Sequence, residues 1–293
     1  MKKILTTAIC LLAVVGAFAQ HQRRSEADSK AAEERQARME QEAREYYANA
    51  DTALYGVRYR FFYLYNKSRN LRYEEDRMVL VRPEVTLDMS YEGLGESRWM
   101  AANKGKGGDP SLAYHLTPDY FFHYPESGRT VKIYRMIAEE YLLGDTVAEN
   151  RWNITDETRK IGEYNCRKAT IDKHGRSWTA WFTTDLPHKA APRDFTGLPG
   201  VVLGLADSTG EVVWAFNGLL ENLPDSKLYI KYPDKLKTIS PEDFRKAVRI
   251  VALSDGKHLN DAGVWNMNPS SYPSKLRPAT GIDALNSDNP IEK

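Results

Sequence analysis

Cysteine is nearly absent from this chain of 293 residues, which has only Cys10 and Cys166. Cys10 lies inside an apolar N-terminal segment, so the rest of the chain keeps Cys166 alone. One cysteine cannot form an internal disulfide. The stability of the folded chain must therefore come from the burial of a hydrophobic core.

Long hydrophobic runs are also scarce. The apolar run from Ile4 to Val15 follows Lys2-Lys3 and precedes Ala17-Phe18-Ala19. A charged start, a short apolar segment and a small-residue cleavage site are typical of a signal peptide, which we place at residues 1–19. We therefore expect export to the periplasm, the outer-membrane periphery or the medium. No later run reaches the roughly 18 apolar residues of a transmembrane helix, so we expect no membrane span in the mature chain.

Neither sign of charge is in excess, because 41 lysines and arginines face 40 aspartates and glutamates. A balance of this kind without a basic stripe argues against nucleic acid as a partner. The sequence also lacks the Gly-x-Ser-x-Gly, His-Glu-x-x-His, phosphate-loop and dinucleotide-binding motifs. From these absences we expect a non-catalytic protein.

The histidines His115, His123 and His174 do not have the spacing of metal ligands. We therefore predict no metal site and no cofactor. Cys166 is interpreted as a small buried hydrophobe on an alternating strand. The alternative is a nucleophile that His174 or His188 would activate.

Alternation of apolar and polar residues is the dominant pattern of the chain. It predicts strands, because successive side chains of a strand point to opposite faces of the sheet. The expected strands cover 55–65, 77–81, 85–91, 120–124, 130–137, 140–147, 201–206 and 211–217, and two more flank a hairpin turn at Gly175. We predict a mainly β fold, with one domain over 51–265 built as a curved antiparallel sheet or a half-open barrel.

Two helices are expected beside the sheet. Residues 20–50 are rich in Ala, Glu, Arg and Gln, which favours a charged, solvated helix. Ser240 suits an N-cap, Pro241 the first helical position and Gly256 the end of the second helix. Residues 266–293 are rich in Pro, Ser and Asn, and we expect a poorly ordered polar tail there.

The segment Gly197-Leu198-Pro199-Gly200 is predicted to be a structural turn that leads into a strand. Proline at the second place and glycine at the third favour a type II turn over Leu198–Val201, with a positive φ at Gly200. A phosphate-binding loop would place its glycines before a helix, whereas these precede a strand.

Aromatic residues gather on the strands on either side of this turn. Trp178, Trp181, Phe182 and Trp214 are the candidate ligand-binding residues. Two interpretations are open: a core in which the indole rings pack, or an apolar groove that is partly exposed to solvent.

The segments 151–187 and 194–214 also carry a family resemblance. The residues concerned are Trp152, Ile161, Tyr164, Cys166, Lys168-Ala169, Gly175-Arg176, Ala180–Thr183, Pro187 and Gly197–Gly200. In this order they resemble the GLPGLI family of exported Bacteroidetes proteins, a family of unknown function. The resemblance implies an exported protein with an antiparallel β architecture, and it supplies no catalytic residues.

The function expected from these patterns is that of an exported cell-envelope protein without catalytic activity. It would bind an apolar or extended ligand or another envelope protein, or it would assist an outer-membrane complex. Two alternatives are kept: an envelope hydrolase acting on peptide or glycan, and a structural component of a surface assembly. Exposure of the Trp178, Trp181 and Trp214 side chains distinguishes a groove from a core.

Overall fold

The computed structural model describes residues 47–91, 119–136, 139–147, 149–222, 228–240, 242–247, 289 and 291, with isolated residues between 30 and 45. The expected signal peptide, and Gly256 at the expected end of the second helix, lie outside these residues. The chain divides into two units, Met1–Ala48 and Asn49–Lys293. In the first unit, the described residues between Lys30 and Glu45 are helical and exposed. None of the described helical segments has the length and apolar character needed to cross a bilayer.

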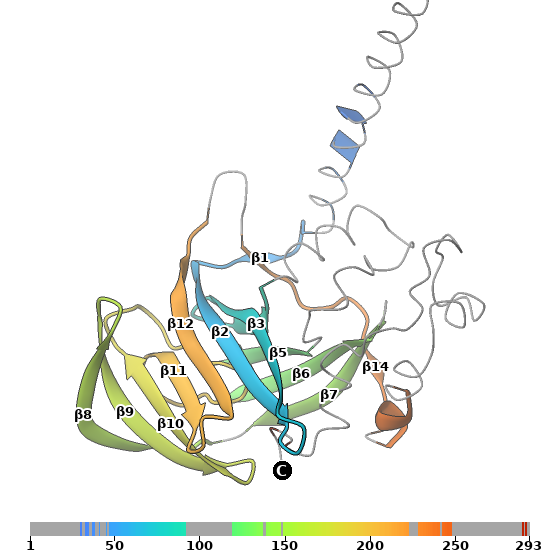
Figure 1. The fold of residues 1–293 in the computed structure, drawn as a ribbon. Coiled ribbons are helices and arrows are strands. Elements are labelled where there is room, and N and C mark those ends of the chain that lie inside the picture. Colours follow the sequence, from blue (N-terminus) through green and yellow to red (C-terminus); the bar gives the residue numbers. More distant parts are fainter. Residues whose placement is uncertain are drawn as a thin grey trace, which may run out of the picture. The chain divides into compact units, whose positions relative to one another are not determined.

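The second unit is built on one large sheet of twelve strands (Figure 1). The strands lie side by side in the order β14-β7-β6-β5-β4-β3-β2-β12-β11-β10-β9-β8. Every neighbouring pair is antiparallel except β14 and β7, and β14 and β8 form the two edges. The sheet is therefore not closed into a barrel. A separate pair is formed by β1 and β13.

The strand bounds are as follows: β1 Asp51–Thr52, β2 Tyr55–Asn66, β3 Leu71–Val81, β4 Thr86–Ser90, β5 Asp119–Tyr124, β6 Arg129–Met136, β7 Glu139–Val147, β8 Asn153–Ile161, β9 Tyr164–Lys173, β10 Arg176–Thr183, β11 Val201–Asp207, β12 Val212–Leu220, β13 Tyr229–Ile230 and β14 Lys237–Thr238.

The sheet carries a core on each face, because alternate residues of β3 point in opposite directions. Val79 and Val81 belong to the first core, together with the buried face of β2 and with residues of β9 to β12. Met78 and Leu80 belong to the second core, which Leu228 and Ile230 help to cover. Both faces of the central strands are thus buried, and this explains why β4 is buried at every position.

The expected fold class is confirmed: the chain is mainly β, and its large open sheet is dominated by antiparallel pairs. The helix at residues 242–247 begins as expected, because the Ser240 hydroxyl accepts a hydrogen bond of 3.1 Å from the Asp243 amide. The edge strand β8 was not predicted. Its residues are mostly exposed on both faces, so its sequence shows no alternation of apolar and polar residues.

Two residues of the expected C-terminal tail are described, and both lie against the β-domain. Asn289 is 1% exposed. Ile291 packs against the first core.

Candidate functional site

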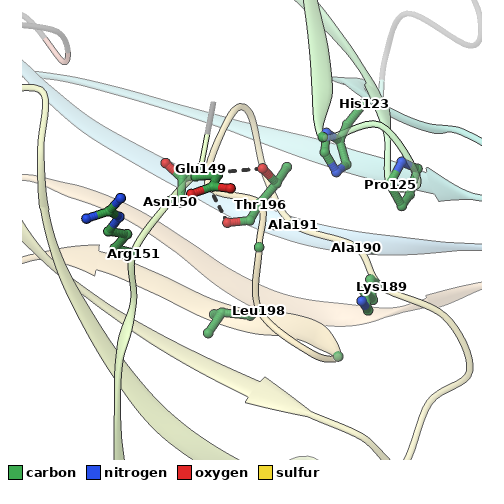
Figure 2. Close-up of a pocket in the computed structure, with 13 residues that line it drawn as sticks. His123, Pro125, Glu149, Asn150, Arg151, Lys189, Ala190, Ala191, Thr196 and Leu198 are labelled. Carbon is green, nitrogen blue, oxygen red and sulfur yellow. Dashed lines mark hydrogen bonds between the residues drawn. The ribbon is translucent and has the colours of Figure 1, made fainter. Parts of the chain in front are cut away.

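A cavity of about 300 Å³ opens where three connections between strands meet (Figure 2). The β5–β6 turn, the β7–β8 connection and the long β10–β11 connection each supply part of its wall. The lining residues are His123, Pro125, Gly128, Glu149, Asn150, Arg151, Lys189, Ala190, Ala191, Thr196, Gly197, Leu198 and Gly200. The glycine–proline segment thus contributes to a cavity wall, and it also leads into β11.

The backbone of the glycine–proline segment differs from the predicted type II turn. Gly197 has a φ of +98°, whereas Gly200 is not among the glycines with positive φ. The prediction of a left-handed Gly200 was therefore wrong. Gly200 is required for a steric reason, since a Cβ atom there would lie 2.0 Å from the Thr183 carbonyl oxygen. The close approach follows from the packing of this segment against the end of β10, which the local sequence does not reveal.

Asn150 holds the β10–β11 connection in place from the opposite wall. Its side-chain amide donates to the Asp194 carbonyl at 2.7 Å and to the Thr196 carbonyl at 3.0 Å. Its carbonyl oxygen accepts from the Lys173 ammonium at 2.8 Å. The Trp152 indole donates to the Thr196 carbonyl at 2.8 Å. These bonds satisfy the carbonyl groups of a loop that has no strand partner there.

An ion cluster next to Asn150 fixes the same connection. The Asp194 carboxylate lies 2.9 Å from the Lys173 ammonium and 2.8 Å from His174 Nε2. Burial alone would raise the pKa of Asp194, but the hydrogen bond from His174 and the charges of Lys173 and Arg193 outweigh it and lower the pKa well below the usual value. Asp194 is therefore an ionised structural residue at neutral pH and not a proton donor.

Arg193 ties the connection to the neighbouring part of the sheet. Its backbone amide donates to the Asp88 carboxylate at 2.6 Å, and its guanidinium lies 2.9 Å from the Asp119 carboxylate. Its φ of +52° is unusual for a residue that carries a side chain, and these contacts hold it in that conformation. The cavity wall is thus anchored to β4 and β5.

Three charged side chains at the cavity remain available to a ligand. Glu149, Arg151 and Lys189 are exposed, and none of them has a hydrogen bond or ion pair among the described residues. Figure 2 shows Arg151 and Lys189 on separate segments on either side of the glycine–proline segment. His123 is buried, which lowers its pKa and keeps it neutral at pH 7. The cavity therefore combines donors, one carboxylate acceptor and an apolar floor at Leu198.

The aromatic residues predicted as ligand-binding lie elsewhere. Trp178 and Trp214 are each 1% exposed and Phe182 is 2% exposed, and all three belong to the first core. The Trp178 ring lies 4.5 Å from that of Phe195, which reaches it from the β10–β11 connection. Trp181 is half-buried and packs against the same core, and the Arg159 guanidinium stacks 4.1 Å from its ring. The structure thus places three of the four inside the first core and the fourth against it, and none of the four lines the cavity.

Cys166 is fully buried, and burial raises the pKa of its thiol. Its thiol donates a weak hydrogen bond of 3.8 Å to the Tyr164 carbonyl. Neither His174 nor His188 is paired with it among the described residues. Across all the residues that the structure describes, no group of three His, Cys, Asp or Glu side chains could hold a metal ion.

Sequence reasoning missed the residues that form the cavity. Glu149, Asn150, Arg151 and Lys189 lie outside strands and have no periodic pattern or motif spacing. Their nearest signal was the glycine–proline segment, which marked a special backbone conformation without indicating what faces it.

Comparison with known proteins found one matching family model and several similar solved structures. A family model described as "N-glycanase peptide, N-terminal domain" matches residues 131–217. Two solved structures, described as PNGF-II in the C2 and P21 space groups, align with this chain at a TM-score of 0.47, with 14% and 13% identity. The alignments cover 69% and 70% of this chain but 34% of each of those chains. The chain therefore spans about a third of their length. No curated protein matches this chain.

These findings correct two expectations. The resemblance to the GLPGLI family is overturned, because the family model that matches the same region is the N-glycanase one. The expectation of a non-catalytic protein that binds an apolar or extended ligand was also wrong, and the alternative of a hydrolase acting on peptide or glycan fits better.

Proposed function

We propose that this protein acts on N-linked glycans, and that the cavity beside the glycine–proline segment recognises the glycan or glycopeptide. One observation carries the proposal: the region matched by the N-glycanase model, residues 131–217, supplies ten of the thirteen lining residues, all but His123, Pro125 and Gly128. The likeness and the cavity therefore fall on the same part of the chain.

The chemistry of the lining supports a sugar ligand. Sugar hydroxyls both donate and accept hydrogen bonds, and Arg151 and Lys189 supply donors while Glu149 supplies an acceptor. The volume of about 300 Å³ is at the lower end of the range for small-molecule sites. Hydrogen bonds to charged groups contribute more than neutral ones, so these three side chains are expected to dominate the affinity.

The cavity is assigned to recognition and not to bond cleavage. Hydrolysis of a bond between sugars commonly uses two carboxyl groups that flank the bond, and hydrolysis of the amide linkage between an N-glycan and asparagine likewise needs an acid or base placed at the bond. Among the described residues, Glu149 is the single carboxylate in the lining, while Asp88, Asp119 and Asp194 are held in ion pairs outside it. The cavity would hold the glycan while other groups carry out its hydrolysis.

Removal of either cavity cation is expected to weaken glycopeptide binding. Fluorescence anisotropy with a labelled high-mannose glycopeptide and the full chain should give saturable binding. Arg151→Ala and Lys189→Ala should each raise Kd about tenfold, the loss expected for one charge-assisted hydrogen bond. Both side chains are exposed, so the fold should be unchanged.

The matched controls are Arg69→Ala and Lys160→Ala, which remove exposed cations on the β2–β3 turn and on β8. They should leave Kd unchanged. Equal binding of the same peptide without its glycan, or equal losses in the control variants, would refute glycan recognition at this cavity.

A further inference from the structure

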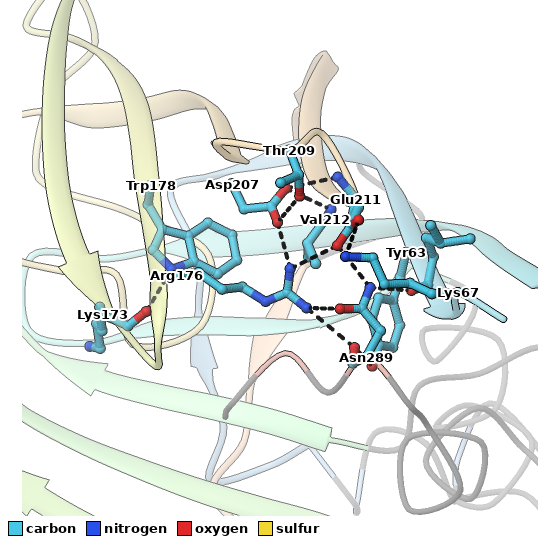
Figure 3. A network of polar contacts seen from close by, with 11 residues as sticks. Tyr63, Lys67, Lys173, Arg176, Trp178, Asp207, Thr209, Glu211, Val212 and Asn289 are labelled. Carbon is cyan, nitrogen blue, oxygen red and sulfur yellow. Dashed lines mark hydrogen bonds and ion pairs between the residues drawn. The ribbon is translucent and has the colours of Figure 1, made fainter. Parts of the chain in front are cut away.

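A second polar site lies at the other end of the same strands (Figure 3). Arg176 begins β10, Asp207 ends β11 and Glu211 follows in the turn before β12. The Arg176 guanidinium is 2.6 Å from the Asp207 carboxylate and 3.2 Å from that of Glu211. The Arg176 side chain is 4% exposed. A buried cation and two carboxylates thus form a preorganised group of hydrogen-bonding partners, which we call the Arg176 socket.

Asn289, which lies close to the C-terminus, fills the Arg176 socket. Its side-chain oxygen accepts from Arg176 at 2.5 Å. Its side-chain nitrogen donates to the Leu64 carbonyl at 2.7 Å and to the Glu211 carboxylate at 3.0 Å. Its backbone carbonyl accepts from the Tyr63 hydroxyl at 2.9 Å and from Arg176 at 3.3 Å. Two residues later, Ile291 packs against the first core.

This set of partners distinguishes asparagine from aspartate. A carboxamide has one acceptor oxygen and a nitrogen with two donor hydrogens, and each of the three finds a partner here. An aspartate in its place would direct a second carboxylate oxygen at the Leu64 carbonyl and the Glu211 carboxylate, both of which are acceptors. The buried acceptors would then lose their donor, and two negative charges would face each other.

We propose that the Arg176 socket is a peptide-binding site that selects an asparagine side chain followed two residues later by an aliphatic one, and that the chain's own C-terminal residues occupy it. The site is separate from the glycan cavity, and the proposal does not depend on the proposed function. Occupation in cis holds Asn289 against Leu64 of β2, Arg176 of β10 and Glu211. A free peptide with the same pattern competes for the site.

Glu211 makes the docking sensitive to acid. Burial raises the pKa of Glu211, but hydrogen bonds from Lys67, Asn289 and Arg176 outweigh it and lower the pKa to about 2. The other charged group at this carboxylate is Asp207, whose side chain accepts from the Glu211 backbone amide at 2.8 Å. Lys67 and Arg176 lower this pKa in the empty socket as well, and docking of Asn289 lowers it further. Peptide affinity should therefore decline only in acid, as the pH falls below the ordinary glutamate range and Glu211 takes up a proton, and Glu211→Gln should flatten that decline.

The decisive experiment uses the full chain with Asn289→Ala, which empties the socket without removing any segment. A fluorescein-labelled peptide with the sequence of residues 287–293 should bind this variant saturably. The wild-type chain, whose socket is filled, should bind the peptide at least tenfold more weakly. The same peptide with aspartate at the position of Asn289 should also bind the variant at least tenfold more weakly.

Two further variants guard against misfolding as an explanation. Tyr63→Phe in the Asn289→Ala background removes one hydroxyl and keeps the ring. It should lower the affinity for the peptide several-fold. Asn153→Ala replaces an exposed asparagine on β8 in a chain that keeps Asn289. Its socket should stay filled, so it should bind the peptide as weakly as the wild-type chain does. Failure of the peptide to bind a folded Asn289→Ala chain, or equal affinity of the asparagine and aspartate peptides, would overturn the proposal.

Discussion

Replacement of Arg77 by methionine should lower the free energy of unfolding by about 3–5 kcal/mol at pH 7, the usual loss when one partner of a buried ion pair is removed. The side chain of Arg77 is 2% exposed, and its guanidinium lies 3.0 Å from Asp88, 3.2 Å from Glu75 and 3.1 Å from Asp119. Methionine fills much of the same volume, so the loss would come from carboxylates left without a cation. Arg193 and Lys132 would be the cations that still act on Asp119.

The pH dependence of the Arg77→Met loss identifies its cause. Burial already raises the pKa of Asp88 in spite of the Arg77 charge, and removal of that charge raises it further. A raised pKa in the folded state favours folding at low pH, so the difference from the wild type should shrink between pH 7 and pH 5. Asp88→Asn in the Arg77→Met background should recover part of the stability. Urea unfolding at both pH values measures this, and a loss of equal size at both would point to packing instead.

The matched control is Arg69→Met on the exposed β2–β3 turn, which should change stability by no more than about 0.5 kcal/mol. The Arg77 cluster also has a link to function. Arg193 joins it to the β10–β11 connection. At pH 5, where the Arg77→Met chain is expected to stay folded, this substitution should therefore weaken glycopeptide binding.

Gly200→Ala is the substitution with the second large expected effect. It should lower the free energy of unfolding by about 3 kcal/mol, the upper end of the usual range for overpacking. The new Cβ would lie 2.0 Å from the carbonyl oxygen and 2.8 Å from the carbonyl carbon of Thr183. Both are backbone atoms at the end of β10, so no side-chain rotation relieves the clash. The β10–β11 connection would have to move away from the strand, and the cavity wall would move with it.

The control for this substitution is Gly144→Ala on β7, where the nearest atom is 3.9 Å from the new Cβ and φ is not in the left-handed region. Its thermal midpoint should stay within the error of the wild-type value. An unchanged thermal midpoint for Gly200→Ala would show that the segment can move away from Thr183 at little cost in stability. That result would contradict the expected clash.

How much of the molecule could be predicted depended on the range of the interactions involved. Strand β2 was predicted correctly because its buried aromatic residues alternate with arginines, and this periodicity is local. The start of the helix after Ser240 was equally local, because the hydroxyl and the Asp243 amide are three residues apart. Strand β8 has no such pattern, because an exposed edge strand has no buried face and so needs no alternation of apolar and polar residues.

The site depended on contacts between distant segments. Asn150 bonds to Asp194 and Thr196, which are 44 and 46 residues away. Asn289 bonds to Leu64 across 225 residues. Polar residues in connections have no period and no fixed spacing, so nothing in their local sequence distinguishes a solvated side chain from one in a cavity wall.

The sequence by itself determined the β class and the position of most strands, because the alternation of buried and exposed side chains acts over a few residues. The tertiary structure decided what the segment 197–200 faces, why position 200 must be glycine, which glycine of the segment takes a positive φ, and that Trp178 and Trp214 are core residues. The reason is that burial and steric contact depend on which distant strands become neighbours. That order of strands, β12 beside β2 and β11 beside β10, is a property of the folded sheet as a whole.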